Sequence, residues 1–169
     1  KFTTDIGAWS QAAGKALDTG AAVPDMPKEP EKLQLGHNQE TGTYQAMIHP
    51  LVPCALRGFI WYQGESNAQR AWQYRTLFPA MISDWRRLWK QGDFPFLYVQ
   101  LAPFKYGHNP VLLAEAWESQ LKTLAVPNTG MCVTTDITAI NDIHPKNKQD
   151  VGRRLALWAL AKNYGKEGL

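Results

Sequence analysis

The sequence predicts an α/β protein built around a parallel β-sheet. Three short apolar runs, 59–63, 94–102 and 130–137, are each followed by a longer segment in which apolar residues recur at helical spacing. Strand, helix, strand, helix, strand, helix is the order expected of a parallel sheet with helical crossovers. The apolar runs hardly alternate with polar residues, which is typical of strands covered by helices on both faces.

The first 45 residues differ from this pattern and are predicted to form a peripheral arm or insertion. Residues 1–17 carry apolar side chains at helical spacing, which predicts a short helix. The stretch AAVPDMPKEP (21–30) contains prolines that oppose both helix and sheet, and residues 31–45 are polar and rich in turn formers. The regular pattern begins at residue 46, so an α/β domain is predicted over 46–169.

The predicted helices of this domain have recognisable ends. The first covers 68–91, and Gly92 is expected to end it. The second begins at Asn109 and Pro110, with asparagine as cap and proline in the first turn. The third covers 146–163. The apolar residues at helical spacing are Trp72, Leu77, Phe78, Met81, Ile82, Trp85, Leu88 and Trp89 in the first helix, Leu113, Ala116, Trp117, Leu121 and Leu124 in the second, and Val151, Leu155, Trp158 and Ala159 in the third.

Composition excludes several classes of protein. A chain of 169 residues with 44% hydrophobic and 20% charged residues can fill a core and remain soluble. Lysine and arginine are scattered, which argues against nucleic-acid and membrane surfaces because these concentrate basic residues. No apolar run approaches the roughly 18 residues of a membrane span. Cys54 and Cys132 lie in apolar surroundings, and both are predicted to be small buried hydrophobes.

Parallel α/β sheets bind ligands beyond the carboxyl ends of their strands. The first segment in that position, QGESN (63–67), contains Ser66. Gly64 and Ala68 flank this serine with the small residues that a nucleophile elbow requires two positions before and after it. Ser66 is therefore a candidate nucleophile of an α/β-hydrolase. The alternative is that Ser66 or Asn67 caps the helix that follows.

The last post-strand segment, TAINDIHP (138–145), contains the candidate base His144. An imidazole there can deprotonate a hydroxyl and later protonate the leaving group. A neighbouring carboxylate would fix its tautomer, and Asp142 lies two residues away, with Asn141 three residues away. Asp136 or Asp142 followed by His144 also matches the chain order Ser, Asp, His of α/β-hydrolases. The alternative is an exposed histidine beside a turn-forming Asn-Asp pair.

The remaining histidines point to no metal or cofactor. His49 precedes a proline and is predicted to be structural, His37 lies in the arm, and His108 lies in the post-strand segment APFKYGHN (102–109), either near substrate or in solvent. Neither H-x-x-x-H nor C-x-x-C spacing occurs, and no Gly-rich phosphate loop is present. No metal and no cofactor are therefore expected.

Four segments resemble the sialate O-acetylesterases and related carbohydrate acetylesterases of the SGNH-hydrolase superfamily. They occur in the family's order and are YQAMIHPLVPCALRGFIWYQGESNA (44–68), FPFLYVQLAPF (94–104), NTGMCVTTDI (128–137) and DIHPKNKQDVGRRLALWAL (142–160). The resemblance implies a three-layer, flavodoxin-like fold with a parallel sheet whose first strand is absent from this chain. It also implies hydrolysis of acetyl esters on sugars, with sialic acid the expected sugar, and a periplasmic or secreted location.

The family's nucleophilic serine lies in a Gly-Gln-Ser-Asn motif after the first strand, and this chain has no such motif. Its serines are Ser10, Ser66, Ser83 and Ser119. The chain opens KFTTDIG, without an initiator methionine or signal peptide. The resemblance therefore implies the C-terminal part of a catalytic domain, processed or excised from a longer protein. Its partner would be a preceding segment of the same domain that supplies the serine.

The resemblance also assigns roles to residues of this chain. Gln63, Gly64, Glu65 and Ser66 match the oxyanion-side block of the family, with Asn67 beside them as a further oxyanion or substrate-binding candidate. His144 matches the catalytic histidine. The superfamily places aspartate three residues before that histidine, where this chain has Asn141. Asp142 is therefore the first candidate for the acid member, Asp136 the second, and a backbone carbonyl the third.

Two other classes of function stay open at this point. One is a non-catalytic carbohydrate-binding or structural fragment whose loop aromatics hold a glycan. The other is an α/β-hydrolase that uses Ser66. The sequence also leaves open whether the sugar is sialate, xylan or another acetylated glycan, because substrate loops vary freely on one fold.

Overall fold

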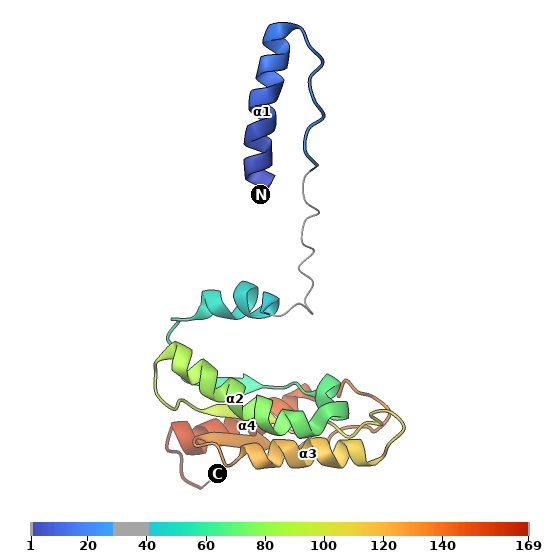
Figure 1. Cartoon of the computed structure of the whole chain (residues 1–169). Helices are drawn as coiled ribbons and strands as arrows, with labels where there is room; N and C mark the ends of the chain where they lie inside the picture. Colours follow the sequence, from blue (N-terminus) through green and yellow to red (C-terminus); the bar gives the residue numbers. More distant parts are fainter. Residues whose placement is uncertain (1, 29–40, 169) are drawn as a thin grey trace. The chain divides into compact units, whose positions relative to one another are not determined.

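The structure is a computed structural model that describes residues 2–28 and 41–168 (Figure 1). Contacts divide the chain into two compact units, Lys1–Pro50 and Leu51–Leu169. The predicted arm over 1–45 falls within the first unit, and its role as an insertion stays a prediction. The α/β architecture belongs to the second unit.

The first unit contains helix α1 (Phe2–Thr19), as its apolar spacing predicts. The proline-containing stretch 21–28 has no regular structure, and the indole N–H of Trp9 donates to the carbonyl of Pro24 at 2.8 Å. A π-helical turn, η1 (Tyr44–Ile48), and a 3-10 turn, η2 (His49–Leu51), follow. His37 and most of the turn-rich stretch 31–45 lie outside the described residues.

The second unit contains a three-stranded parallel sheet in the order β1, β2, β3. The strands are β1 (Phe59–Trp61), β2 (Phe96–Val99) and β3 (Thr129–Cys132). Each is shorter than the apolar run that predicts it, because the outer residues of each run continue into loops. The parallel direction of all three strands confirms the predicted sheet.

Three helices alternate with these strands. They are α2 (Ala71–Trp89), α3 (Val111–Thr123) and α4 (Lys148–Asn163), and Figure 1 shows α2 and α3 packed along one another. The start predicted for the first of them at residue 68 is wrong, because a 3-10 helix, η3 (Glu65–Arg70), precedes α2. The end of α2 is formed by Lys90, whose φ of 55° is left-handed, two residues before the predicted glycine.

Helices α2 and α3 cover one face of the sheet through an aromatic core. Phe96 and Tyr98 of β2 are fully buried. The ring of Phe78 on α2 lies 6.0 Å from that of Phe96 and 5.0 Å from that of Tyr98, edge-on in both cases. The hydroxyl of Tyr98 donates to the carbonyl of Gln120 on α3 at 2.7 Å. This face therefore joins β2 to both helices.

Helix α4 covers the opposite face of β2 and β3. Leu97 and Val99 alternate with the aromatic residues of β2, and they form a second buried cluster with Val151 and Leu155 of α4. Residues of a strand alternate between the faces of a sheet, so these two clusters lie on opposite sides. The result is the predicted three-layer α/β arrangement. The predicted inward face of α4 is confirmed, with Trp158 partly buried against the same cluster.

Two apolar residues at helical spacing in α2 lie on the surface. Trp72 is 69% exposed and Leu77 is 55% exposed. The apolar residues of this segment are spread around more of the helix than the sheet and α3 cover, so these two fall on the outer side. Phe78, Ile82 and Trp85 are buried.

The inward face of α3 carries polar as well as apolar residues: Ala116 is buried, and Leu113 and Trp117 pack against a core cluster as predicted. Leu121 is 56% exposed and Leu124 is also exposed, whereas Ser119, Gln120 and Thr123 are buried. The Gln120 amide accepts from the backbone N–H of Leu101 at 2.9 Å and donates to the carbonyl of Val99 at 3.1 Å. Buried polar side chains are tolerated where they are hydrogen-bonded, and here they satisfy backbone groups at the end of β2.

We expect Gln120→Met to lower the free energy of unfolding by about 2 to 4 kcal/mol, because it leaves the Leu101 N–H and the Val99 carbonyl buried and unpaired. Urea unfolding followed by circular dichroism measures this difference. Leu121→Ala, on the exposed side of the same helix, is the control and should change stability by about 0.5 kcal/mol or less. Equal effects of the two substitutions would contradict a structural role for the Gln120 amide.

The two cysteines differ from each other. Cys132 is 4% exposed and packs in the α4-side cluster, but Cys54 is exposed, so the prediction that it is buried is wrong. Cys54 contributes to the fold through its backbone. Its carbonyl accepts hydrogen bonds from the Trp89 indole N–H at 3.1 Å and from the Gln91 amide at 3.2 Å. These two hydrogen bonds anchor the main chain at Cys54 to the end of α2.

Candidate functional site

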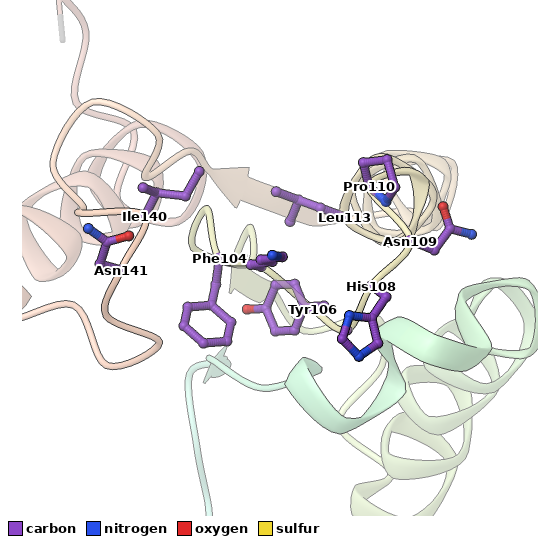
Figure 2. A pocket seen from close by; sticks show the side chains of 10 residues that line it. Phe104, Tyr106, His108, Asn109, Pro110, Leu113, Ile140 and Asn141 are labelled. Atoms are coloured by element: carbon purple, nitrogen blue, oxygen red, sulfur yellow. The ribbon is translucent and has the colours of Figure 1, made fainter.

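The segments that follow β1, β2 and β3 leave the sheet at the same edge, because the strands are parallel. The loop after β2 lies in the middle and borders two cavities. One, of about 370 Å³, is lined by Glu65, Ser66 and Gln69 together with 104–107. The other, of about 390 Å³, lies between the loop after β2 and Ile140 and Asn141 of the loop after β3 (Figure 2). The predicted segments 63–67 and 138–145 thus share one edge of the sheet.

The Gln63 side chain is held at both ends of its amide. Its Nε2 donates to Oδ1 of Asn67 at 2.8 Å, and its Oε1 accepts from the hydroxyl of Tyr74 at 3.3 Å. Tyr74 is buried, and this burial is the main cause that raises its pKa to about 12. Its hydroxyl therefore stays protonated at neutral pH. The structure brings Gln63 and Asn67 together as a hydrogen-bonded pair. The contact with Tyr74 could not be predicted from the QGESN motif, because Tyr74 lies outside it.

Gly64 permits the turn that follows this glutamine. Its φ of 139° is a conformation that residues with a side chain rarely adopt, and its backbone lies against the side chain of Leu101. The turn leads into η3, where Glu65 and Ser66 border the 370 Å³ cavity. Ser66 is exposed and lies inside η3, five residues after the end of β1, whereas an elbow serine sits on the sharp strand-to-helix turn itself.

His144 is exposed in the loop that connects β3 to α4. The hydrogen bond that joins it to Asp142 runs from the His144 backbone N–H to Oδ1 of the carboxylate at 2.9 Å. The structure therefore brings the two residues together through an Asx turn. In the part of the chain that is described, neither Asp142 nor Asp136 makes a hydrogen bond to the imidazole, so the acid member of the site stays a prediction.

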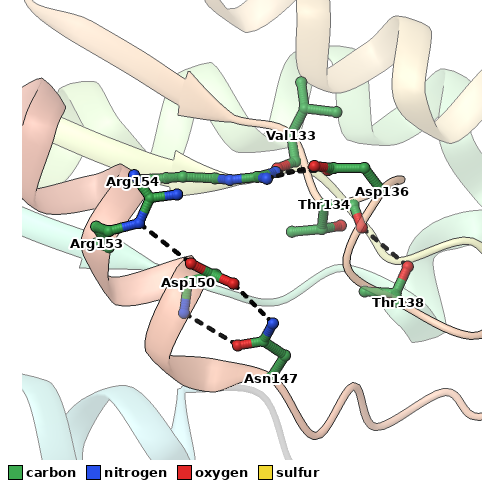
Figure 3. Close-up of polar contacts among 8 residues, drawn as sticks. All are labelled: Val133, Thr134, Asp136, Thr138, Asn147, Asp150, Arg153 and Arg154. Carbon is green, nitrogen blue, oxygen red and sulfur yellow. Dashed lines mark hydrogen bonds and ion pairs between the residues drawn. The ribbon is translucent and has the colours of Figure 1, made fainter.

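Asp136 forms a fork-shaped ion pair with Arg154 of α4 (Figure 3). The two Nη–Oδ distances are 2.7 and 2.5 Å, and Nη1 of Arg154 also donates to the carbonyl of Val133 at 2.5 Å. The hydrogen bonds from Arg154 are the largest cause that lowers the pKa of Asp136 to about 2. Arg154 is 18 residues further along the chain, so sequence reasoning did not find this partner. The pair ties the start of the His144 loop to α4.

We expect Asp136→Asn to reduce stability at pH 7 and to have little effect near pH 2. The folded-state pKa of Asp136 is lowered from an ordinary 3.8 to about 2, so the carboxylate stabilises the fold above 3.8. That contribution is lost as the pH falls through about 2. Urea unfolding of both forms across this range measures the difference. If the difference in unfolding free energy between wild type and Asp136→Asn stayed the same as the pH was lowered, this result would contradict the ion pair.

The other end of the loop is fixed by the cap of α4. Asn147 accepts from the Asp150 backbone N–H at 3.1 Å and donates to the Asp150 carboxylate at 2.8 Å (Figure 3). Such a reciprocal arrangement satisfies backbone groups at the helix N-terminus. The loop that carries Asp142 and His144 is therefore anchored by Arg154 on one side and by Asn147 on the other.

The remaining candidates take different places. His108 borders the 390 Å³ cavity, while His49 lies in the first unit, where its ring meets that of Tyr44 edge-on at 6.0 Å. Ser10 and Ser83 are exposed on helices. Ser119 is buried and donates to the carbonyls of Ala71 and Glu115. Among the described residues, no group of three His, Cys, Asp or Glu side chains is placed to hold a metal ion, and no helix is both long and apolar enough to cross a membrane.

An open parallel sheet with helices on both faces and polar loops at its carboxyl edge defines a three-layer α/β protein, and comparison with known proteins gives its family. The family model described as carbohydrate esterase, sialic acid-specific acetylesterase matches residues 31–161. The chain is 34% identical over 185 residues to the sialate O-acetylesterase of Homo sapiens and 35% identical over 153 residues to that of Mus musculus. These alignments cover 98% and 79% of this chain, and 35% and 28% of the relatives.

A solved structure agrees with this result. The crystal structure of a carbohydrate acetylesterase from Xanthomonas citri matches with a TM-score of 0.69 and 51% sequence identity, over 73% of this chain and 30% of that chain. The chain belongs to the sialic acid-specific acetylesterase family of carbohydrate esterases, and the predicted SGNH-type fold is confirmed. The chain spans about a third of the length of the curated relatives it matches.

Proposed function

We propose that this chain carries the histidine side of a carbohydrate acetylesterase site, and that a serine outside these 169 residues is the nucleophile. The observation that carries the proposal is the placement of two family segments at one edge of the sheet. Residues 63–67 follow β1, and the loop with His144 follows β3. Both lie within the part of the chain that the family model matches.

The positions of the serines support an external nucleophile. A serine hydroxyl is a poor nucleophile at neutral pH unless a base lies within hydrogen-bond reach. Ser119 is buried and bonded to two carbonyls, and Ser10 and Ser83 lie on helix surfaces. Ser66 is at the correct edge of the sheet, but it lies within η3 in the block that resembles the oxyanion side of the family.

The edge of the sheet offers a place for a further strand. Among the described residues, β1 is an outer strand, and its Ile60 is 71% exposed although it is apolar. A parallel strand beside β1 would satisfy the edge N–H and C=O groups and cover apolar surface. Its carboxyl end would then lie next to Gln63 and Gly64, which is where a nucleophile would meet the oxyanion-side block.

The reaction has two half-steps. The serine oxygen attacks the acetyl carbonyl while His144 takes the hydroxyl proton, and polar groups of the 63–67 segment stabilise the oxyanion. The tetrahedral intermediate then collapses, the bond from carbonyl carbon to sugar oxygen breaks, and His144 returns the proton to that oxygen. In the second half-step water attacks the acetyl-serine, again through His144, and releases acetate. Asp142 is the first candidate to orient the imidazole.

The expected substrate is an O-acetylated sialic acid, because the family model and the curated relatives carry that name. Acetate release from 9-O-acetylated sialic acid by the complete enzyme that contains this chain tests the proposal, with acetylated xylan as the comparison. We expect release from the sialic acid. Release from xylan alone, or from neither substrate, would overturn the proposed sugar.

A further inference from the structure

The 390 Å³ cavity lies beside the loop that leads to His144, because Asn141 lines it. Figure 2 shows Phe104 and Tyr106 between two walls, with Ile140 and Asn141 on one side and Leu113, Pro110 and His108 on the other. Its volume is within the range of pockets that hold small molecules, about 300 to 1,000 Å³. A sugar ring therefore fits this space next to the proposed reaction centre.

The floor of the cavity is apolar and fixed. Tyr106 is buried in a core cluster with Leu101 and Ala116, and its hydroxyl donates to the Ala102 carbonyl at 3.3 Å. The ring of Phe104 meets that of Tyr106 edge-on at 5.3 Å. Rings held in this way present a rigid apolar surface. Such a surface suits the C–H groups of a sugar ring.

Lys105 brings a positive charge to this cavity. None of the ten lining residues is an aspartate or glutamate, and Lys105 is exposed. Within the described part of the chain Lys105 takes part in no ion pair, whereas Lys122 pairs with Glu118 at 2.8 Å. Lys105 also lines the neighbouring 370 Å³ cavity, which Glu65 borders, but it forms no ion pair with that carboxylate. An ammonium group that lines a partly apolar cavity and has no ion-pair partner attracts an anionic ligand and can make charge-assisted hydrogen bonds to it.

We propose that this cavity binds the sugar of the substrate and that the Lys105 ammonium binds the carboxylate of an acidic sugar while Phe104 contacts its ring. This inference rests on the proposed function and deepens it. Sialic acids carry a carboxylate that neutral sugars lack, so Lys105 makes the site selective for acidic sugars. The contact is electrostatic, and raising the ionic strength weakens it.

Binding of N-acetylneuraminic acid and of its methyl ester to the complete enzyme that contains this chain, measured by isothermal titration calorimetry or NMR, tests this role without requiring hydrolysis. We expect the free acid to bind about tenfold more tightly than the ester, whose carboxylate is neutralised. Lys105→Met should remove this preference and Lys105→Arg should retain it. Lys162→Met is the matched control, because Lys162 is an exposed lysine in the last turn of α4, and it should keep the preference.

Three results would overturn the inference. They are equal affinity of the wild type for acid and ester, a preference that survives in Lys105→Met, and the absence of saturable binding by either sugar. Thermal melting of each variant separates a binding change from unfolding. Acetate release by the complete enzyme is measured separately, so the proposed function can hold when this inference fails.

Discussion

His144→Ala is expected to lower kcat for acetyl-ester hydrolysis by the complete enzyme by about 10³- to 10⁴-fold. The imidazole accepts the serine proton in one step and returns it to the leaving oxygen in the next, so its removal affects both half-reactions. Stability should change little, because His144 is exposed and the bond that shapes its loop comes from its backbone N–H. Initial rates and a thermal melt of the same preparation measure both quantities.

Asp142→Asn tests the first candidate for orienting the imidazole. An asparagine Oδ1 can still accept the His144 N–H, so the Asx turn is kept. The loss of kcat should be smaller than in His144→Ala if Asp136 or a backbone carbonyl shares the task of orienting the ring. Near-normal turnover in a folded His144→Ala protein would contradict the assignment of the base.

The 169-residue chain by itself is expected to show no more than trace hydrolysis of small acetyl esters. Activation of a serine needs a base within hydrogen-bond reach and an oxyanion site on the other side of the carbonyl. The chain has a candidate base in His144 and a candidate oxyanion block in 63–67, but Ser66 lies within that block. Addition of a preceding segment that supplies the proposed serine, in trans or in cis, should produce the activity. Full turnover by the isolated chain that is lost in Ser66→Ala would contradict this expectation.

The parallel direction of the strands and the edge that carries the candidate site could be predicted from sequence, because they follow from local patterns. The apolar runs around Ile60, Leu97 and Met131 alternate with helical segments, and this alone indicates parallel strands with their loops at one edge. The loop position of His144 follows from the same argument. Predicting these features does not require knowing which side chains contact one another in the folded protein.

Contacts between distant residues could not be predicted in this way. The pairing of Asp136 with Arg154 depends on how α4 returns across the sheet. The hydrogen bonds of the buried Gln120 amide depend on the path of the loop that follows β2. The exposed Leu121 beside it shows that spacing identifies a helix but does not fix which face points inward.

The charge at the cavity was also not apparent from sequence. Lys105 stands in an ordinary loop, APFKYGHN, and only the fold shows that this loop borders both cavities at the sheet edge. Likewise, the sequence does not indicate that the hydroxyl of Tyr74, a residue of α2, donates a hydrogen bond to the Gln63 side-chain amide. Tyr74 acts through a partner on another element, and Lys105 acts through the cavities that its loop borders.

Labelling with a fluorophosphonate, which reacts with activated serines, tests the central claim most directly. In the complete enzyme we expect stoichiometric labelling of a serine outside these 169 residues, identified by peptide mass spectrometry, and its loss in His144→Ala. The isolated chain should not be labelled. Stoichiometric labelling that maps to Ser66, and that disappears in Ser66→Ala, would contradict the account and establish Ser66 as the nucleophile.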